Sequence, residues 1–241
     1  MIVAPSESGL DLVDTDFTVE YWFKRTAAAQ ANIMMKRDVF LTIDRGWYTR
    51  ISKDGSVEFG MAGGGNAHGW ITGAKVSPAD ASWHHYAFTY RKSVDLCVFF
   101  IDGKASPTNT WSNKPKFTPI SGSPEPIRIG FDPGYPDFVL PGELAWTAVS
   151  NTARYFVAFT PPRLPVNDAW LRGAWILHTQ SGTNWSNPAS KNVGVSSLAP
   201  TVTNGLCGAS GAACGDAKLA LWEQCDDGNK VQGDGCSATC Q

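Results

Sequence analysis

This sequence has little charge, no long hydrophobic run and no extended stretch with helical periodicity. Charged residues make up 17% of the chain and the formal net charge is −2, so it lacks the basic surface that binds nucleic acid. No segment approaches the ~18 consecutive apolar residues of a membrane-spanning helix. The N-terminus also lacks the basic segment followed by an apolar one that marks a signal peptide. The sequence therefore predicts neither a polynucleotide partner nor a membrane span.

The residues that are abundant are typical of a β protein. The 241 residues include 24 glycines, 15 prolines and 10 tryptophans, a composition that favours short strands and tight turns over helices. A chain of this length can bury a large core. We therefore expect one large β domain with a smaller appendage.

The clearest local signal is a hairpin at residues 83–104, whose two strand-like runs flank a short polar turn. Side chains alternate along a strand, so His84 and His85 point to opposite faces and cannot both reach one ligand. A hydrogen-bonded core or interface histidine is the usual outcome. The second run is apolar on both faces, which indicates a strand within a two-sheet sandwich. Asp102-Gly103 supplies the turn that ends it.

Other alternating runs predict further strands at regular spacing. The expected strands are residues 17–24, 33–36, 39–43, 46–51, 57–61, 71–76, 127–130, 142–149 and 170–178. Residues 105–126 are rich in proline and small polar residues and predict a long surface loop. Residues 150–155 are compatible with one helical turn.

The cysteines indicate an oxidising, extracellular setting. Cys97 stands alone, whereas five cysteines lie within residues 207–241, and such density in a small polar segment favours disulfides. Zinc is the competing interpretation, but no CxxC pair or nearby histidine supports it. Cys97 is either a buried apolar residue or the partner of Cys207.

Six segments occur in the order and spacing of laminin-G-like jelly-roll modules: FTVEYWFK, RGWYTRISKDGSVEFG, WHHYAFTY, VFFIDGK, IRIG and GELAWTAVSNTARYFVAFTPP. These modules belong to the concanavalin A-like lectin and glucanase superfamily, and the resemblance covers residues 2–162. It implies an all-β, two-sheet antiparallel jelly-roll sandwich. It also implies a carbohydrate-binding or adhesive module on a secreted protein.

Residues 214–240, CGDAKLALWEQCDDGNKVQGDGCSATC, resemble the cysteine-rich repeat of surface proteins in myxobacteria and related bacteria. The blocks CDDGN and GDGC provide the resemblance, while Ala217 departs from it, because glycine is usual at that position. The predicted organisation is a β-sandwich at residues 1–183, a linker at 184–206 and a disulfide-rich C-terminal module at 207–241.

One segment departs from the order usual in the laminin-G-like family. A strand like that at residues 173–183 normally opens such a module, whereas here it comes last. It either completes its own sandwich or inserts into a neighbouring subunit. The second arrangement would make a strand-exchanged homo-oligomer or filament, because a contact that does not close continues from subunit to subunit.

The sequence lacks the acidic triplet, Glu-x-Asp-x-x-Glu, by which glucanases of this superfamily place an acid and a nucleophile across the glycosidic bond. Glu20, Glu58 and Glu143 each stand alone on their expected strands. We expect them to be solvated or at a rim, and we expect the protein not to be an enzyme.

Exposed aromatic residues in loops are the candidates for stacking on sugar rings, although each is singly more often a packing residue. The aromatic candidates are Trp47, Tyr48, Trp70, Trp111 and Tyr135. The predicted ligand-binding set is Trp70, Trp111, Asp132, Tyr135 and Asp137.

The C-terminal module contains a cluster of oxygen-bearing side chains among glycines: Asp226, Asp227, Asn229 and Asp234. Calcium takes six to eight oxygen ligands, so this cluster predicts a calcium site. The alternative is a set of Asx turns without an ion, and the EF-hand spacing is not met.

These features together predict a secreted, non-catalytic adhesion or carbohydrate-binding module of a bacterial surface protein, with a glycan or a surface protein as its partner. The alternative is a structural subunit of an extracellular filament, assembled by strand exchange or by stacking of sandwiches. Fold alone does not choose between them.

Overall fold

The computed structural model describes residues 2–4, 8–12, 14–38, 45–63, 68–75, 79–106, 109–112, 122–135, 140–181, 184–186 and 194–196. In chain order its elements are β1 Ile2–Ala4, η1 Ser8–Leu10, β2 Phe17–Arg25, β3 Ala31–Arg37, β4 Arg45–Ile51, β5 Ser56–Gly63, β6 His68–Lys75, β7 Trp83–Arg91, η2 Lys92–Val94, β8 Leu96–Ile101, β9 Lys104–Ala105, β10 Asn109–Ser112, β11 Ile127–Ile129, β12 Gly142–Ser150, β13 Leu171–Ser181, β14 Asn184–Ser186 and β15 Gly194–Ser196. The two η elements are short 3-10 turns, and these ranges contain no α-helix. Nor do they contain any helix with the length and apolarity needed to cross a bilayer.

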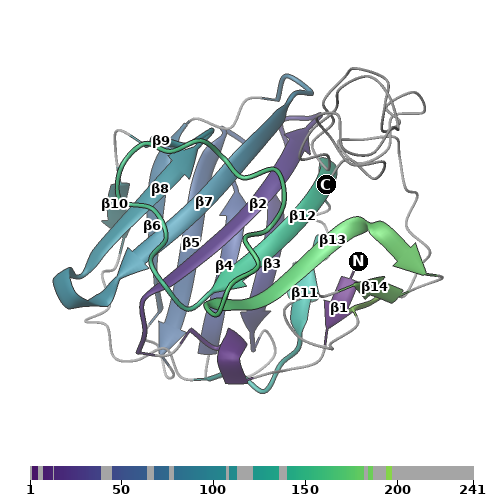
Figure 1. Ribbon diagram of the computed structural model, residues 1–241. Coiled ribbons are helices and arrows are strands. Elements are labelled where there is room, and N and C mark those ends of the chain that lie inside the picture. The colour runs from purple at the N-terminus through teal and green to yellow at the C-terminus, as the bar shows by residue number, and fades with distance from the viewer. Residues whose placement is uncertain are drawn as a thin grey trace, which may run out of the picture.

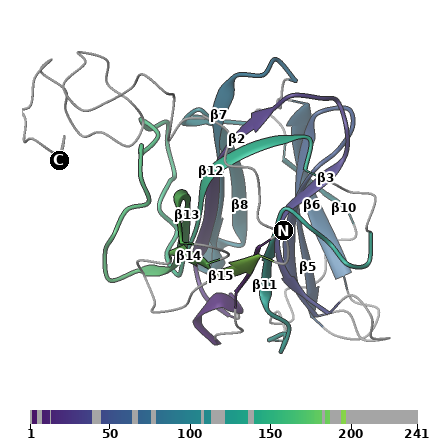
Figure 2. The ribbon, with the colours of Figure 1, turned by 90° about the vertical axis from the view of Figure 1, so that its right-hand side faces the viewer.

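The strands form two antiparallel layers, which confirms the predicted jelly-roll sandwich (Figures 1 and 2). One sheet has six strands in the order β10-β6-β5-β4-β3-β11, and the other has five in the order β13-β12-β2-β7-β8. The short strands β1, β15 and β14 continue the hydrogen-bonded ladder from one sheet to the other, and β9 extends it beyond β8. Each sheet therefore has an inner face toward its partner and an outer face.

The core lies between the two sheets and is largely aromatic. Alternation along β2 places four residues in it: Phe17, Val19, Tyr21 and Phe23. Phe59 of β5 and Phe88 of β7 stack across the gap between the sheets, with ring centroids 4.1 Å apart and planes 9° apart. Burying such a ring stabilises the fold by about 1.5–3 kcal/mol, so these contacts hold the two layers together.

The hairpin expected at residues 83–104 is confirmed. Strands β7 and β8 pair from Tyr86 opposite Ile101 to Arg91 opposite Leu96, with η2 between them. The turn after β8 places Asp102 at φ +49° and Gly103 at φ +74°. Both values lie in the left-handed region, which glycine and, among other residues, aspartate adopt most readily.

The strand that comes last in this chain pairs with the chain's own sheet. β13 runs antiparallel to β12, from Trp146 opposite Ile176 to Ser150 opposite Leu171, and it lies at the edge of the five-stranded sheet (Figure 1). Of the two arrangements expected from the sequence, the structure has the one in which the strand completes its own sandwich.

Several local expectations need correction. No helical turn forms at residues 150–155. The predicted surface loop 105–126 includes strand β10, because Asn109–Ser112 finds an edge to pair with on β6. Strands β14 and β15, within residues 184–206, join β13 to β1, while the assignment of that segment as a linker stays a prediction. The predicted strand 39–43 lies outside the described residues, and the domain boundary at residue 183 stays a prediction.

Candidate functional site

Residues 151–170, which we call the strap, cross the outer face of the five-stranded sheet (Figure 1). Trp22 and Trp146 donate their indole N–H groups to the carbonyls of Pro162 and Arg163, at 2.9 and 2.8 Å. The Phe159 amide donates to the Gly103 carbonyl at 3.0 Å. The strap therefore satisfies its backbone with groups of the sheet and covers that face with the chain itself.

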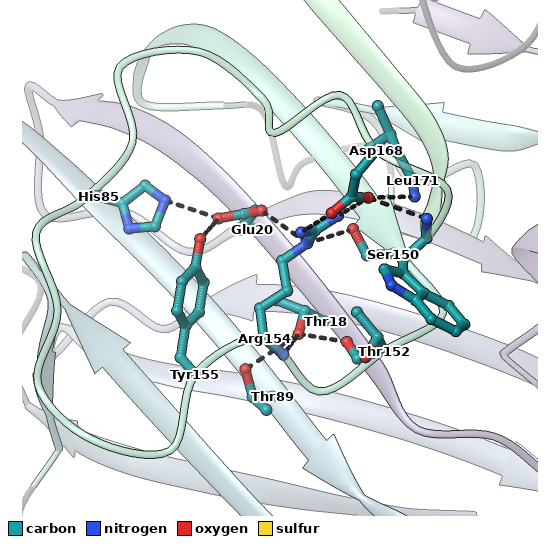
Figure 3. Close-up of polar contacts among 11 residues, drawn as sticks. Thr18, Glu20, His85, Thr89, Ser150, Thr152, Arg154, Tyr155, Asp168 and Leu171 are labelled. Atoms are coloured by element: carbon teal, nitrogen blue, oxygen red, sulfur yellow. Dashed lines mark hydrogen bonds and ion pairs between the residues drawn. The ribbon is translucent and has the colours of Figure 1, made fainter.

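A buried polar network lies beneath the strap (Figure 3). Glu20 of β2 and His85 of β7 have side chains that are 1% and 0% exposed. The Glu20 carboxylate accepts a hydrogen bond from the Tyr155 hydroxyl at 2.8 Å, and the same oxygen lies 3.2 Å from His85 Nε2. Its other oxygen lies 3.9 Å from Nε of Arg154. One carboxylate thus connects two strands of the sheet to the strap.

Arg154 extends this network to the start of β13. Its guanidinium donates to both carboxylate oxygens of Asp168, at 2.9 and 2.8 Å, and to Oγ of Ser150 at 2.8 Å. Asp168 also accepts from the amides of Trp170 and Leu171. These hydrogen bonds to the charged form, with that of Arg154 the largest cause, lower the pKa of Asp168 to about 2.

Tyr155 is held as a neutral donor. Burial raises the pKa of its hydroxyl well above the ordinary value of 10, and the negative charge of Glu20 raises it further. Its ring stacks on Phe159 with centroids 3.6 Å apart and planes 3° apart. Tyr155 therefore joins the polar network to the aromatic side of the strap.

This network is suited to holding the strap and not to catalysis. The expectation that Glu20 is solvated is wrong, because the strap covers the face on which alternation places it. Glycoside hydrolysis needs two carboxylates across a bond, but Asp168 is paired with Arg154 and Glu20 is sealed from solvent. The prediction that His85 is a hydrogen-bonded core histidine is confirmed.

The outer face of the six-stranded sheet bears a different set of side chains, which we call the tyrosine–arginine cluster: Arg37, Tyr48, Arg50 and Tyr135. The guanidinium carbons of Arg37 and Arg50 lie 5.0 and 5.4 Å from the centroid of the Tyr48 ring. Arg37 also lies 6.0 Å from the ring of Tyr135. Cations over a ring face are attracted by its negative quadrupole, so the four side chains support one another.

Gly60 of β5 provides the surface on which Tyr48 lies. The two residues are partners across the β4–β5 ladder, and a Cβ added to Gly60 would fall 2.0 Å from Cε1 of the Tyr48 ring. Only glycine lets the ring approach the backbone this closely. Arg50, beside Tyr48, is fixed by an ion pair with Glu58, whose other oxygen accepts from the Ser52 hydroxyl at 2.7 Å.

Tyr135 is presented by a loop that Asp132 organises. Asp132 is fully buried and accepts hydrogen bonds from the Asn32 side chain and from the Gly134 amide, the latter at 2.8 Å. The Tyr135 amide donates to the Asp132 carbonyl at 3.0 Å, while Tyr135 itself is 45% exposed. Asp132, a member of the predicted ligand-binding set, thus organises the loop that exposes Tyr135, and its role in ligand binding stays a prediction.

The other predicted site residues fall in three groups. Trp70 and Trp111 lie on neighbouring strands, with Trp70 opposite Ser112 and Trp111 opposite Ile71, and their side chains are outside the described part. Asp137 and the proposed calcium ligands Asp226, Asp227, Asn229 and Asp234 also lie outside it. Trp47, one of the aromatic candidates, is a core residue that stacks on Phe59 and donates to the Leu10 carbonyl.

Sequence reasoning missed Arg37 and Arg50. Arg50 alternates with the buried Thr49 and Ile51, so its place beside Tyr48 could have been found from period-two alternation. Arg37 could not, because a bulge in β3 between Asn32 and Met34 shifts the pairing with β4. The bulge turns Lys36 into the interior and leaves Arg37 beside Tyr48.

The fold is that of a two-sheet jelly-roll module in which one outer face is covered and the other presents aromatic and cationic side chains. A laminin G family model, described as concanavalin A-like lectin/glucanases superfamily, matches residues 2–155. The chain belongs to this superfamily. A domain of unknown function, DUF4215, matches residues 203–241, and the relation of that segment to the myxobacterial repeat stays a prediction.

Several solved structures are similar to this chain. A candidate carbohydrate-binding protein from Bacteroides ovatus is 17% identical with a TM-score of 0.58, over 80% of this chain and 54% of that protein. The carbohydrate-binding module CBM40 of the Ruminococcus gnavus IT-sialidase, bound to α2,6 sialyllactose, is 14% identical with a TM-score of 0.41, over 54% of this chain and 72% of that module.

Domains LG4-5 of the mouse laminin α1 chain are 16% identical with a TM-score of 0.43, over 65% of this chain and 42% of theirs. This chain thus spans about half of the Bacteroides protein and less than half of the laminin fragment. No curated protein is significantly similar to it in sequence. At these identities the likeness concerns the fold.

Proposed function

We propose that this chain is a non-catalytic module that binds glycans, on a cell surface or in the surrounding matrix, through the tyrosine–arginine cluster. The observation that supports it is that Arg37, on the outer face of the six-stranded sheet, lies over the rings of both Tyr48 and Tyr135, 5.0 and 6.0 Å from their centroids. Tyrosine offers an apolar ring face and a polar hydroxyl, and arginine offers five fixed donors. Sugars present the complementary apolar C–H faces and hydroxyl groups.

A binding role fits the distribution of carboxylates better than catalysis does. Glu58 forms an ion pair with Arg50, and Glu143 forms one with Lys24 at 2.7 Å. Glu20 is sealed beneath the strap. Glycoside hydrolysis requires an accessible carboxylate with a second carboxylate facing it. Glu20, Glu58 and Glu143 do not meet this requirement.

The cellular setting is part of the proposal. The density of cysteines in residues 207–241 favours disulfides and hence an extracellular location. The proposed calcium site, Asp226, Asp227, Asn229 and Asp234, would lie in that module and not in the cluster. The strand-exchange form of the filament alternative requires β13 to enter the sheet of another subunit, whereas β13 pairs here with β12 of its own chain. The form built by stacking of sandwiches stays a prediction.

The test compares two aromatic residues with equal exposure on opposite sides of the sandwich. Tyr135 and Phe156 are both 45% exposed, but Tyr135 belongs to the cluster and Phe156 to the strap. The wild type, Tyr135→Ala and Phe156→Ala are applied to an array of neutral and acidic oligosaccharides, and the strongest ligand is then measured by calorimetry. We expect Tyr135→Ala to weaken binding at least about fivefold, as removal of one stacking ring should.

Phe156→Ala should bind like the wild type. The proposal fails if the wild type binds nothing on the array, or if the two variants lose affinity equally, because neither result would single out the cluster.

A further inference from the structure

A histidine joins two turns of the five-stranded sheet, one before β7 and one after β8. His84 Nδ1 lies 2.6 Å from Asp102 Oδ2, and its Nε2 lies 3.3 Å from Asp80 Oδ2. Asp102 itself and Ala81, which follows Asp80, have φ values of +49° and +58°. Positive φ values are uncommon for residues other than glycine and persist where neighbouring contacts enforce them.

The turn at Asp102 is also where the strap is attached. The second oxygen of Asp102 accepts from the His85 amide at 2.9 Å, and the Asp102 amide donates to the His85 carbonyl at 2.9 Å. The next residue, Gly103, accepts the Phe159 amide at 3.0 Å. The fit there is close, since a Cβ on Gly103 would lie 1.8 Å from the Phe159 carbonyl oxygen.

Phe159 connects the attachment at Gly103 to the polar network under the strap. Its ring lies 5.8 Å from His85 and 5.4 Å from Phe100, and it stacks on Tyr155. Tyr155 in turn donates to Glu20. A shift of the Asp102-Gly103 turn therefore displaces Phe159, which links the turn to the buried carboxylate through Tyr155.

We propose that His84 is a pH-dependent clamp: when it is protonated it bridges Asp80 and Asp102 and holds the strap at Phe159, and when it loses its proton this part of the strap opens more often. A protonated imidazole has two N–H donors, one for each carboxylate, whereas the neutral ring has one donor and one acceptor. Deprotonation thus breaks one bridge and turns a nitrogen lone pair toward a carboxylate.

The direction of the effect follows from the surroundings of His84. Partial burial lowers its pKa, but the hydrogen bonds and charges of Asp102 and Asp80 outweigh burial, so the pKa is raised above 6.5. Protonation therefore stabilises the folded clamp. This contribution is complete below the unfolded value of 6.5 and is lost as pH rises through the folded pKa.

Other charged groups near the clamp are engaged elsewhere. His84 is opposite Phe23 of β2. Lys24, the residue after Phe23, forms an ion pair with Glu143 and lies over the Trp83 ring. His85, Glu20 and Arg154 belong to the network on the other face. Lys104, after the turn, is exposed. Asp80 and Asp102 are thus the groups that respond directly to the charge of His84.

The experiment measures amide hydrogen exchange of Phe159 from about pH 5 to about pH 8, the range across which histidines titrate. The wild type is compared with His84→Gln, and the Gly130 amide, which donates to the Ile33 carbonyl at 2.9 Å, serves as internal reference. We expect the protection of Phe159 in the wild type to fall about two- to fivefold as pH rises, in line with a partly exposed ion pair. In His84→Gln it should not change relative to Gly130.

Two further variants keep the test decisive. Asp80→Asn should reduce the pH dependence and lower the NMR titration midpoint of the His84 ring. Asp54→Asn, which alters a similar side-chain-to-backbone turn between β4 and β5, should leave both unchanged. The proposal is overturned if His84→Gln, or Asp80→Asn where the first variant does not fold, retains the wild-type pH dependence. It is also overturned if the His84 ring titrates at or below the ordinary value of about 6.5. The result does not depend on whether the tyrosine–arginine cluster binds glycans.

Discussion

The two outer faces of this sandwich differ in whether another part of the chain covers them. On the five-stranded sheet, polar and aromatic side chains are covered by the strap, and Glu20 and His85 are fully buried. On the six-stranded sheet, Tyr48, Arg37 and Arg50 remain partly exposed and Tyr135 is 45% exposed. Period-two alternation produces similar polar outer faces on both sheets. What distinguishes them is whether another part of the chain lies on top.

This difference teaches that a polar residue on the outer face of a strand is not by itself a surface residue. Beneath a covering segment it becomes a buried group that needs partners and contributes to stability. Without such a segment it is available to a ligand. We therefore expect substitutions on the covered face to change mainly the free energy of unfolding, and substitutions on the open face to change mainly binding.

The largest effect should come from Glu20→Ala. It leaves the Tyr155 hydroxyl and His85 Nε2 buried without their acceptor, so the free energy of unfolding should fall by about 3–5 kcal/mol. Urea denaturation measures this loss. Glu143→Ala is the control, since its ion pair with Lys24 is about a quarter exposed and such pairs contribute about 1 kcal/mol or less. Equal losses in the two variants would contradict the distinction between the faces.

Gly60→Ala tests the open face by changing the backbone surface on which the Tyr48 ring lies. The added methyl would overlap the Tyr48 ring, which must move away from the backbone. We expect a loss of about 1–2 kcal/mol in unfolding free energy, typical of overpacking, and a clear loss of glycan affinity in calorimetry. Unchanged affinity would mean that the position of the Tyr48 ring does not matter for binding.

Asp168→Asn should have a smaller and pH-dependent effect. The pKa of Asp168 is lowered to about 2, so its contribution is complete above the unfolded value of about 4 and is lost as pH falls through the folded value. Because Asp168 is partly exposed, we expect the variant to lose only about 1 kcal/mol at neutral pH. Denaturation at successively lower pH should show this difference from the wild type shrinking, and a constant difference would be contrary to the assignment.

Tyr135→Ala should scarcely change stability. Tyr135 is 45% exposed, so the unfolding free energy should change by less than about 0.5 kcal/mol. Thermal denaturation, compared with the loss of glycan binding expected above, checks this. A large destabilisation would mean that Tyr135 stabilises the fold, and it would contradict the expectation that residues of the open face act mainly in binding.

The parts of the fold that could be predicted are those with short-range patterns. β2 and the β7–β8 hairpin were expected because alternation and turn residues lie within the segments themselves. The strap could not be predicted, because its sequence has no periodicity and its hydrogen bonds join residues far apart in the chain, such as Tyr155 and Glu20. For the same reason Glu20 was expected to be solvated, since nothing in its own strand indicates the cover.

The candidate site was predictable in part. Tyr135 was expected to be exposed, and it is; its role in binding stays a prediction. Asp132, in the same loop, is buried, because a short polar side chain in a turn bonds neighbouring amides as readily as it meets a ligand. The position of Arg37 beside Tyr48 depends on the bulge in β3. The bulge arises from the pairing of β3 with β4, so it cannot be recognised from the sequence of β3 alone.

The strap has a consequence for where the independent folding unit ends. The family match stops at residue 155, yet Pro162, Arg163 and Asp168 beyond it accept hydrogen bonds from Trp22, Trp146 and Arg154 within it. The edge of β12 that faces away from β2 is likewise paired by β13. A module excised or grafted at the limit of the match would carry an uncovered sheet and an open edge, so the transferable unit includes at least the strap and β13.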